Sequence, residues 1–473
     1  MPTRRIPVLT TLSIFVLVST GATQPTQTNS RSRPPNIVII TADDLGYGDL
    51  GSYGHPTIQT PNLDRMAAEG QRWTNFYAQA PVCSPSRAAL LTGRLHLRSG
   101  MFGRERGVFF PDSLAGLPPS EITVAEALRE LGYATGIIGK WHLGHRPEYL
   151  PTRHGFDSWF GIPYSNDMDW NLPAEMENRT AYFNPQPSYW LVPLMRNEDE
   201  IERPANQYTL TRRYAEEAVT FIETHRHEPF FLYLPHTMPH MPLFRSEAFK
   251  GRSRAGVYGD VIEEIDWAVG QVISALDRLS LSQQTLVVFT SDNGPWTSFQ
   301  THGGSAGPLR HGKGTTFEGG MRVPGIFRWP ETITPGVVQA IGSAMDLFTT
   351  TITIAGGQIQ TNQPIDGLDL SPVLFDTGPS PRRMMAYYRM GELYAFRLGS
   401  YKAHFVTEGR YGLSPERTDH DPPLLFNLDV DPSERYNVAP TQPDRLATVV
   451  AAAAQYESAL TVAEPLFDLR AAP

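Results

Sequence analysis

The chain has 473 residues, of which 40% are hydrophobic and 19% are charged, and its formal net charge is −9. This charge is spread along the sequence without a basic stripe, so we expect no nucleic-acid partner. Cys83 is the only cysteine, which excludes an intramolecular disulfide and leaves stability to the core and to any bound metal. About 440 residues follow the N-terminal leader, too many for one ordinary core, so a large and a smaller domain are predicted.

The N-terminus has the pattern of a signal peptide. Arg4 and Arg5 precede an apolar stretch over residues 6–18, and residues 19–22 are small enough for a cleavage site. The apolar stretch is too short to span a bilayer, and its basic start fits Sec or twin-arginine export equally. We predict a signal peptide over residues 1–23, a disordered leader over residues 24–35, and an exported protein with no membrane anchor after cleavage.

Short apolar runs then alternate with amphipathic patterns, which is typical of an α/β domain with a mostly parallel central sheet flanked by helices. Thr60 and Pro61 are a good helix start, with proline at the first helical position. Further helices are predicted over residues 123–131, 207–225 and 257–279. Strands are predicted over residues 36–41, 133–139, 229–234 and 285–290. We assign residues 36–375 to this large domain.

The segment over residues 163–204 is rich in Asn, Pro and aromatic residues and has no clean periodicity. Its aromatic residues suit a substrate-binding wall or a docked loop equally well. Beyond residue 375 the pattern changes to short strands over residues 385–389, 393–397 and 402–406, followed by a helix over residues 444–460. Residues 376–473 are therefore predicted to form a smaller C-terminal α+β subdomain.

Polar side chains follow each of the four predicted strands, at the edge where sites form in open α/β sheets. We expect them to converge on one crevice. In chain order they are Asp43 and Asp44, Lys140 and His142, His236 and His240, and Asp292 and Asn293.

The acidic members of this set predict a cation site. An Asp pair alone often caps a helix, but Asp43 and Asp44 together with Asp292 and Asn293 form a group of hard oxygen ligands. Such a group fits calcium or magnesium, and calcium is favoured because magnesium demands tighter octahedral geometry. The lack of thiolate and imidazole among these four residues disfavours zinc.

The basic members predict an anion site with proton carriers. Lys140 and His142 would point to the same side of an extended chain. His236 and His240 have a side chain that can give up a proton near neutrality. Lys313 stands in a glycine-rich turn, where backbone and cation can approach an anion closely.

Cys83 opens the run Cys-Ser-Pro-Ser-Arg, which ends at Arg87 and is followed by Leu-Thr-Gly-Arg over residues 91–94. A free cysteine is most often a small buried hydrophobe. This run, however, resembles the signature that sulfatases present for oxidation of the cysteine to formylglycine. The whole chain from residue 36 resembles the arylsulfatases, within the alkaline-phosphatase superfamily. Gly139-Lys140-Trp141-His142 is similar to a hallmark of the same family.

The resemblance is greatest to the arylsulfatase A branch, on the turn around Lys313, the run Pro-Tyr-Ser-Asn-Asp over residues 163–167, and the tail motif over residues 425–432. It implies the fold of that superfamily and a calcium ion held by Asp43, Asp44, Asp292, Asn293 and the modified Cys83. It also implies sulfate contacts by Lys140 and Lys313, a minor substrate contact by Ser165, and stabilisation of the hydrated aldehyde by Arg87.

The implied reaction is hydrolysis of a sulfate monoester, either an aryl sulfate or a sulfated carbohydrate. Hydrated formylglycine at position 83 attacks sulfur, and His240 protonates the leaving oxygen. His142 then deprotonates the second hydroxyl, which expels sulfate and restores the aldehyde. His240 matches the family's histidine two residues before a proline, so His236 is interpreted as a structural neighbour. A formylglycine-generating enzyme or an anaerobic maturase is the implied partner.

Two alternatives remain open from the sequence. One is a phosphate or phosphonate ester hydrolase of the same superfamily, and the other is a noncatalytic protein that binds sulfated glycans with an unmodified Cys83. Animal relatives are rich in cysteine and this chain is not, which favours a bacterial enzyme that is periplasmic or secreted.

Overall fold

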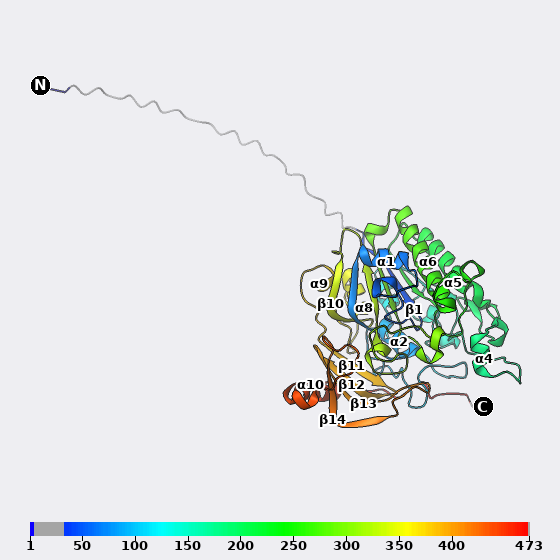
Figure 1. The fold of residues 1–473 in the computed structure, drawn as a ribbon. Coiled ribbons are helices and arrows are strands. Elements are labelled where there is room, and N and C mark those ends of the chain that lie inside the picture. The colour runs from blue at the N-terminus through cyan, green and yellow to red at the C-terminus, as the bar shows by residue number, and fades with distance from the viewer. Residues whose placement is uncertain (4–32, 472–473) are drawn as a thin grey trace. The chain divides into compact units, whose positions relative to one another are not determined.

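A ten-stranded mixed sheet forms the centre of the fold in the computed structural model, which describes residues 1–3 and 33–471 (Figure 1). The predicted signal peptide and most of the predicted leader lie outside these residues. The strands run in the order β10-β2-β9-β8-β1-β7-β3-β4-β5-β6. Their bounds are β1 Asn36–Ala42, β2 Gln71–Tyr77, β3 Ala134–Ile138, β4 Ser158–Gly161, β5 Leu194–Arg196, β6 Asp199–Glu202, β7 Phe230–Pro235, β8 Thr285–Ser291, β9 Arg322–Arg328 and β10 Gly336–Ser343.

The four strands predicted from the sequence lie side by side at the middle of this sheet. β1 pairs in parallel with both β7 and β8, and β3 pairs in parallel with β7 and β4. Antiparallel pairs occur toward the edges, where β9 joins β8 to β2 and β5 joins β4 to β6. The predicted mostly parallel centre is confirmed, and the carboxyl ends of its strands meet at one edge.

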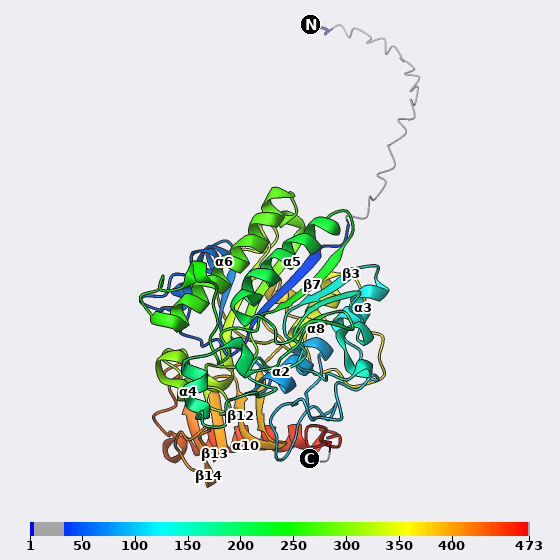
Figure 2. The same cartoon turned by 90° about the vertical axis from the view of Figure 1, so that its right-hand side faces the viewer.

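Helices cover both faces of the sheet, which explains why every residue of β1 is buried. α1 (Pro61–Ala68), α5 (Leu210–Thr224) and α6 (Gly256–Arg278) pack on the face that carries Val38 and Ile40. α2 (Cys83–Thr92), α3 (Val124–Glu130) and α8 (Asp346–Ile354) pack on the face that carries Ile37 and Ile39 (Figure 2). The helices predicted from the sequence are confirmed within a few residues of their ends.

The irregular segment after residue 163 contains only short elements, among them α4 (Asn178–Phe183). The ring of Tyr182 lies 5.0 Å from that of Phe299, and the ring of Phe183 lies 4.7 Å from that of His302, measured between centroids. Of the two interpretations left open by the sequence, these contacts fit a docked loop. Trp170 is 46% exposed and remains on the surface.

A second, antiparallel sheet follows, in the order β11-β12-β13-β14. Its strands are β11 (Met384–Arg389), β12 (Glu392–Leu398), β13 (Tyr401–Thr407) and β14 (Thr418–Asn427), and α10 (Pro443–Ser458) packs on β12 and β13. The short helices α7 (Glu318–Met321) and α9 (Ser371–Leu374) complete the fold. Residues Pro34–Pro473 form one compact unit, and a domain boundary at residue 375 stays a prediction.

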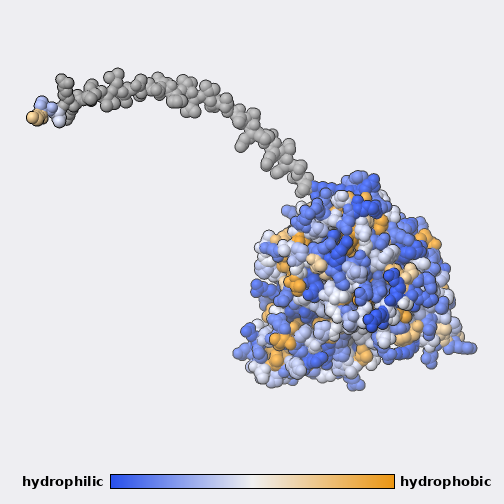
Figure 3. Space-filling model, turned by 45° about the horizontal axis from the view of Figure 1, so that its top comes forward, coloured by the Kyte–Doolittle hydropathy of each residue, from blue (hydrophilic) through white to orange (hydrophobic). Residues whose placement is uncertain are grey.

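The face of the molecule drawn in Figure 3 is mainly hydrophilic, with hydrophobic residues scattered among polar ones. Within residues 1–3 and 33–471, none of the helices combines the length and the apolar composition needed to cross a bilayer.

Candidate active site

The polar groups that follow the four central strands come together at one edge of the sheet, as the sequence predicts. The Nζ atom of Lys140 lies 2.5 Å from Oδ2 of Asp43, although these residues follow different strands. Asn293 donates from Nδ2 to Oδ1 of Asp44 at 2.7 Å. The Nε2 atom of His240 lies 3.6 Å from Oδ2 of Asp44. Each of these side chains is at most 3% exposed, so the charges interact in a medium that screens them poorly.

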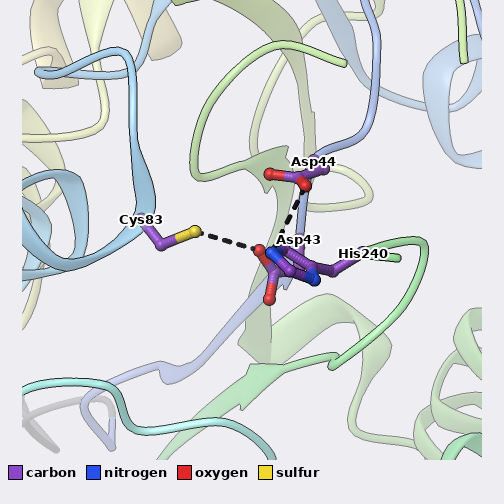
Figure 4. A group of neighbouring side chains, drawn as sticks. All are labelled: Asp43, Asp44, Cys83 and His240. Carbon is purple, nitrogen blue, oxygen red and sulfur yellow. Dashed lines mark hydrogen bonds and ion pairs between the residues drawn. The ribbon is translucent and has the colours of Figure 1, made fainter. Parts of the chain in front are cut away.

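Cys83 reaches this group as the first residue of α2. Val82 before it is extended, and Gly93 ends the helix in the left-handed conformation, with φ 66°. The thiol donates to Oδ1 of Asp43 at 3.3 Å, and Figure 4 shows Cys83 and His240 approaching the Asp43–Asp44 pair from opposite sides. Arg87, one helical turn after Cys83, donates from Nε to Oδ2 of Asp292 at 2.9 Å. The helix therefore places a thiol and a guanidinium in one carboxylate cluster.

Three cations neutralise three carboxylates here. Lys140 pairs with Asp43, and Lys313 lies with Nζ 2.8 Å from Oδ2 of Asp44. Arg87 lies with Nη2 2.8 Å from Oδ2 of Asp292 and 3.6 Å from Oδ2 of Asp43. The cluster is balanced without an added ion, so an added divalent cation would leave two positive charges in excess.

The three carboxyl groups differ in proton affinity. Burial opposes ionisation of Asp43, but Lys140, His240 and Arg87 together hold its pKa well below the ordinary value. Burial raises the pKa of Asp44 to about 7, against the effect of Lys313 and with the help of the neighbouring Asp43 and Asp292 charges. Burial and Asp43 also raise the pKa of Asp292. Asp44 and Asp292 are thus carboxylates whose charge a bound cation would stabilise.

The oxygen donors of this group fit a hard cation. Asp43 and Asp44 can each offer a carboxylate oxygen, and these atoms lie within 4.8 Å of one another and of possible ligand atoms of Cys83 and His240. Asp292 accepts from the backbone N–H of Asp44 at 3.2 Å, so it borders the same space. The Oδ1 atom of Asn293 is buried and has no hydrogen-bond partner among the described residues. An orphaned amide oxygen beside three carboxylates is the donor set that calcium prefers.

The thiol of Cys83 is a poor nucleophile as it stands. Burial, and then the negative charges of Asp292 and Asp43, raise its pKa well above the ordinary value. A thiol reacts through its thiolate, which this surrounding disfavours. The side chain at position 83 therefore has the right place for a nucleophile and the wrong chemistry for one while it remains a cysteine.

His142 has one ring nitrogen fixed and one free. Its Nε2 lies 2.9 Å from the carbonyl oxygen of Phe109, and because a carbonyl only accepts, Nε2 carries the proton. Its Nδ1 has no partner among the described residues, and burial together with Lys140 lowers the pKa of the ring. A neutral imidazole with a free lone pair can act as a base.

His240 is oriented from its other side. Its Nδ1 lies 2.6 Å from the carbonyl oxygen of Met241 and 3.0 Å from Oδ1 of Asn166, so Nδ1 carries a proton and Nε2 faces Asp44. Nε2 also lies 3.3 Å from Oγ of Ser165, which accepts a hydrogen bond from Nζ of Lys140 at 3.0 Å. Burial, and then the charge of Lys313, lowers the pKa of His240.

One geometric expectation is wrong. The sequence predicts that Lys140 and His142 point to the same side if the chain stays extended, but His142 has a left-handed backbone, with φ 61°. The Lys140 side chain pairs with Asp43, while the His142 ring turns to the carbonyl of Phe109. The turn directs the two side chains to different partners within one site. Ser84 supports it, because its Oγ donates to the carbonyl of His142 at 2.8 Å.

His236 stands apart from these contacts. Neither of its ring nitrogens has a hydrogen-bond partner among the described residues, and burial lowers its pKa to about 4. This fits its interpretation as a structural neighbour.

Several contributors were not predicted from the sequence. Trp296 presents its ring to Nζ of Lys313 at 4.3 Å and lies 5.2 Å from the ring of His240, and Tyr411 lies 4.9 Å from Trp296. Asn166 orients His240, and the carbonyl of Phe109 fixes the tautomer of His142. The run over residues 163–167 contained a signal for Asn166, whereas a backbone carbonyl and a distant ring leave none.

Comparisons with known proteins agree with this site. The Sulfatase family model matches residues 35–357, and the model for the C-terminal region of aryl-sulfatase matches residues 380–471. Arylsulfatase A of Bos taurus is 44% identical over 461 residues, which cover 90% of this chain and 89% of the relative. N-acetylgalactosamine-6-sulfatase of Rattus norvegicus is 40% identical over 497 residues, with 98% and 91% covered. Among solved structures, the PsFucS1 sulfatase from Pseudoalteromonas sp. matches with a TM-score of 0.80 and 29% identity, over 90% of each chain.

Proposed function

The chain belongs to the sulfatase family, and we propose that it hydrolyses sulfate monoesters with a formylglycine made from Cys83 and with one bound calcium ion. One observation carries the proposal. The Sγ atom of Cys83 lies 3.3 Å from Oδ1 of Asp43, which belongs to a buried cluster of three carboxylates and three cations. The raised pKa of the Cys83 thiol makes it a poor nucleophile. Oxidation of the residue to an aldehyde, followed by hydration, would replace the thiol with a hydroxyl oxygen that can act as the nucleophile.

Asp43, Asp44, Asp292 and Asn293 would hold the calcium ion, together with the modified residue 83. When bound, the ion supplies Lewis-acid polarisation and charge neutralisation. Magnesium fits less well, because it prefers a rigid octahedral shell of small radius.

Lys140, Lys313 and Arg87 provide the electrostatic part of catalysis. Each pairs with one of the three carboxylates, so a bound calcium ion would leave the site with net positive charge, which would favour the negative charge of the sulfuryl oxygens. Ser165 bridges Lys140 and His240 and is placed to contact the sulfate group.

The two histidines divide the proton transfers. His240 presents Nε2 to the cluster while its Nδ1 is held by Met241 and Asn166, so it is proposed to protonate the leaving oxygen. An anionic substrate next to the ring would raise its lowered pKa and load it with the required proton. His142 has a free Nδ1 and is proposed to take the proton from the second hydroxyl of residue 83, which allows sulfate to leave.

The relatives named above act, by their names, as an arylsulfatase and as a sulfatase of N-acetylgalactosamine 6-sulfate. We propose an aryl sulfate or a sulfated carbohydrate as the substrate of this chain. We also propose that the protein is exported to a bacterial periplasm or secreted, and that a formylglycine-generating enzyme or an anaerobic maturase modifies Cys83 before it acts. No further observation favours a phosphate ester hydrolase or a noncatalytic glycan-binding protein.

The test is turnover of 4-nitrophenyl sulfate by protein produced together with a formylglycine-generating enzyme. We expect release of 4-nitrophenol and sulfate, loss of turnover in Cys83→Ala, and loss after chelation of calcium that is restored when calcium is added back. Turnover that survives in Cys83→Ala contradicts the proposal.

His240→Ala tests the assignment of the acid. Loss of a general acid costs about 10²- to 10⁴-fold with a poorly leaving sugar alcohol, and less with 4-nitrophenol, which departs readily without a proton. kcat measured for both kinds of substrate gives the comparison, and His236→Gln, at a neighbouring buried histidine, serves as the control. Equal losses for the two leaving groups would show that His240 is not the acid.

A further inference from the structure

A pocket of about 230 Å³ lies directly beside the proposed nucleophile. On one side it is lined by Pro81, Val82 and Pro85, which flank Cys83 in the chain. On the other side it is lined by residues of the C-terminal sheet region, among them Arg389 and Arg410. The reaction as proposed above uses none of these pocket residues.

Two contacts tie this pocket to the catalytic cluster. Gly314, which follows Lys313, lines the pocket and donates its N–H to the carbonyl of Pro81 at 2.8 Å. Tyr411 also lines the pocket, and its ring lies 4.9 Å from that of Trp296, which faces the Nζ atom of Lys313. The pocket therefore borders both the turn that carries Lys313 and the aromatic pair that faces it.

The pocket contains one guanidinium that the protein leaves without a carboxylate. Arg106 pairs with Asp112, with Nη1 and Oδ1 2.5 Å apart, and Arg389 pairs with Glu408 at 3.1 Å. Across residues 33–471, no carboxylate lies within ion-pair distance of Arg410, whose Cζ lies 5.4 Å from the ring of Tyr411. A partly buried cation without a partner is placed to receive an anion from outside.

The aliphatic part of the Arg410 side chain packs closely against Gly314. Gly314 has a φ of 81°, and a Cβ added there would come within 2.5 Å of Cγ of Arg410. The lack of a side chain at Gly314 thus lets Arg410 pack against the turn that carries Lys313. The free guanidinium and the proposed sulfate-binding lysine are fixed to each other through this contact.

A second hollow, of about 600 Å³, shares Phe102, Arg389, Met390 and Arg410 with the first. It adds Arg104 and Arg417, and also Glu392 and Glu408, which pair with Arg417 and Arg389 and leave Arg410 without a carboxylate partner among residues 33–471. Phe110 and Tyr411 line the first pocket and are 37% and 39% exposed. Exposed aromatic rings next to guanidinium groups suit sugar rings that carry acidic substituents.

We propose that Arg410 binds a second anionic group, a sulfate or a carboxylate, on the leaving group of the substrate. The substrate is then a sulfated carbohydrate with at least two negative charges, whose sugar ring stacks on Tyr411 or Phe110 in the pocket. This inference rests on the sulfatase function proposed above, since it assigns the leaving-group side of the same site.

The test measures binding and turnover separately. Calorimetry with Cys83→Ala protein gives Kd for heparin and chondroitin sulfate tetrasaccharides, with the desulfated tetrasaccharides as reference. In the same Cys83→Ala background, Arg410→Met keeps an aliphatic side chain packed on Gly314 and removes the guanidinium charge. We expect roughly 10- to 100-fold weaker binding of at least one sulfated tetrasaccharide, with partial recovery in Arg410→Lys. In enzyme with Cys83 intact, Arg410→Met should lower turnover of a sulfated tetrasaccharide more than it lowers turnover of 4-nitrophenyl sulfate, which has no second anion.

Arg254→Met is the matched control, because Arg254 is exposed and lines neither hollow. It should bind the tetrasaccharides like the parent protein. Equal Kd values for the parent and Arg410→Met, binding of neither sulfated tetrasaccharide, or equally tight binding of the desulfated forms would overturn the inference. If the enzyme with Cys83 intact does not turn over 4-nitrophenyl sulfate, the sulfatase function is overturned. The binding result would still decide the role of Arg410.

Discussion

The proposed catalytic cluster, formed by Asp43, Asp44, Asp292 and their cationic partners, and a second buried cluster around Lys402 both combine carboxylates with cations. They differ in how the carboxyl groups are stabilised. The second, which we call the Lys402 cluster, comprises Glu318, Lys402, His404 and Glu434. Lys402 lies with Nζ 3.0 Å from Glu318 and 2.9 Å from Glu434, and His404 lies 2.6 Å from Glu434. All four side chains are fully buried.

The proton affinities of the carboxyl groups show the difference. Burial opposes the charge of Glu318, but Lys402, Arg322 and Arg397 hold its pKa below the ordinary value. Lys402 and His404 do the same for Glu434, again against burial. In the catalytic cluster the pKa values of Asp44 and Asp292 are raised. In the Lys402 cluster the neighbouring cations hold the carboxyl groups ionised, whereas in the other cluster a bound cation would stabilise the charges of Asp44 and Asp292.

The Lys402 cluster also helps to position Lys313. Glu434 accepts from the backbone N–H of Glu318 at 2.7 Å, and Lys402 donates to the carbonyl of Thr316 at 2.8 Å. Both contacts hold the turn that carries Lys313. The C-terminal sheet thus contributes to the candidate active site by fixing the loop that carries Lys313.

Lys402→Met should have the largest effect on stability. Removing one partner of a buried ionic network leaves the other charges uncompensated, so the free energy of unfolding should fall by about 3–5 kcal/mol. Urea unfolding followed by fluorescence measures the change. Arg417→Met, which removes an exposed pair with Glu392, should cost less than about 1 kcal/mol. A Lys402→Met protein as stable as Arg417→Met would contradict the structural role of the cluster.

Calcium should stabilise the protein through the catalytic cluster alone. At a free concentration of about 100 Kd, binding to the native state adds about 2.7 kcal/mol to the free energy of unfolding. Asp292→Asn should abolish this gain, while Glu318→Gln should lower the starting stability and keep the gain. Thermal unfolding in EDTA and in calcium gives both values. If calcium stabilises Asp292→Asn as much as the parent protein, the ion binds at another site.

The pH dependence of the Lys402 cluster should be the smallest effect. Because the pKa of Glu318 is lowered from 4.5 in the native state, its stabilising charge is fully present above that value and is lost as pH falls. The difference in unfolding free energy between the parent and Glu318→Gln should stay constant above about pH 5 and shrink by roughly 1 kcal/mol per pH unit below pH 4.5. A difference that grows on acidification would mean that Glu318 is buried uncharged.

The sequence predicts the middle of the large sheet well, because strands buried on both faces read as continuous apolar runs. It does not predict β2 or β9, where polar residues such as Gln71, Asn75 and Arg322 interrupt the pattern. It also does not predict β14, which contains Pro422 and Pro423.

The candidate site likewise contains residues that the sequence places correctly and residues that it cannot place. Groups that stand just past a strand, such as Asp43 and Asp292, can be placed because strand ends converge. The left-handed turn at His142 cannot, because tertiary contacts of Ser84 and Phe109 support it. The Lys402 cluster joins residues 318 to 434, and no local pattern reports a pairing over that distance.

Cys83 should be present as formylglycine in the active protein. Mass spectrometry of the peptide that contains position 83, from protein made with a formylglycine-generating enzyme, tests it most directly. We predict the mass of the aldehyde, together with turnover of 4-nitrophenyl sulfate that rises in proportion to the modified fraction. An intact thiol in fully active protein would contradict the account.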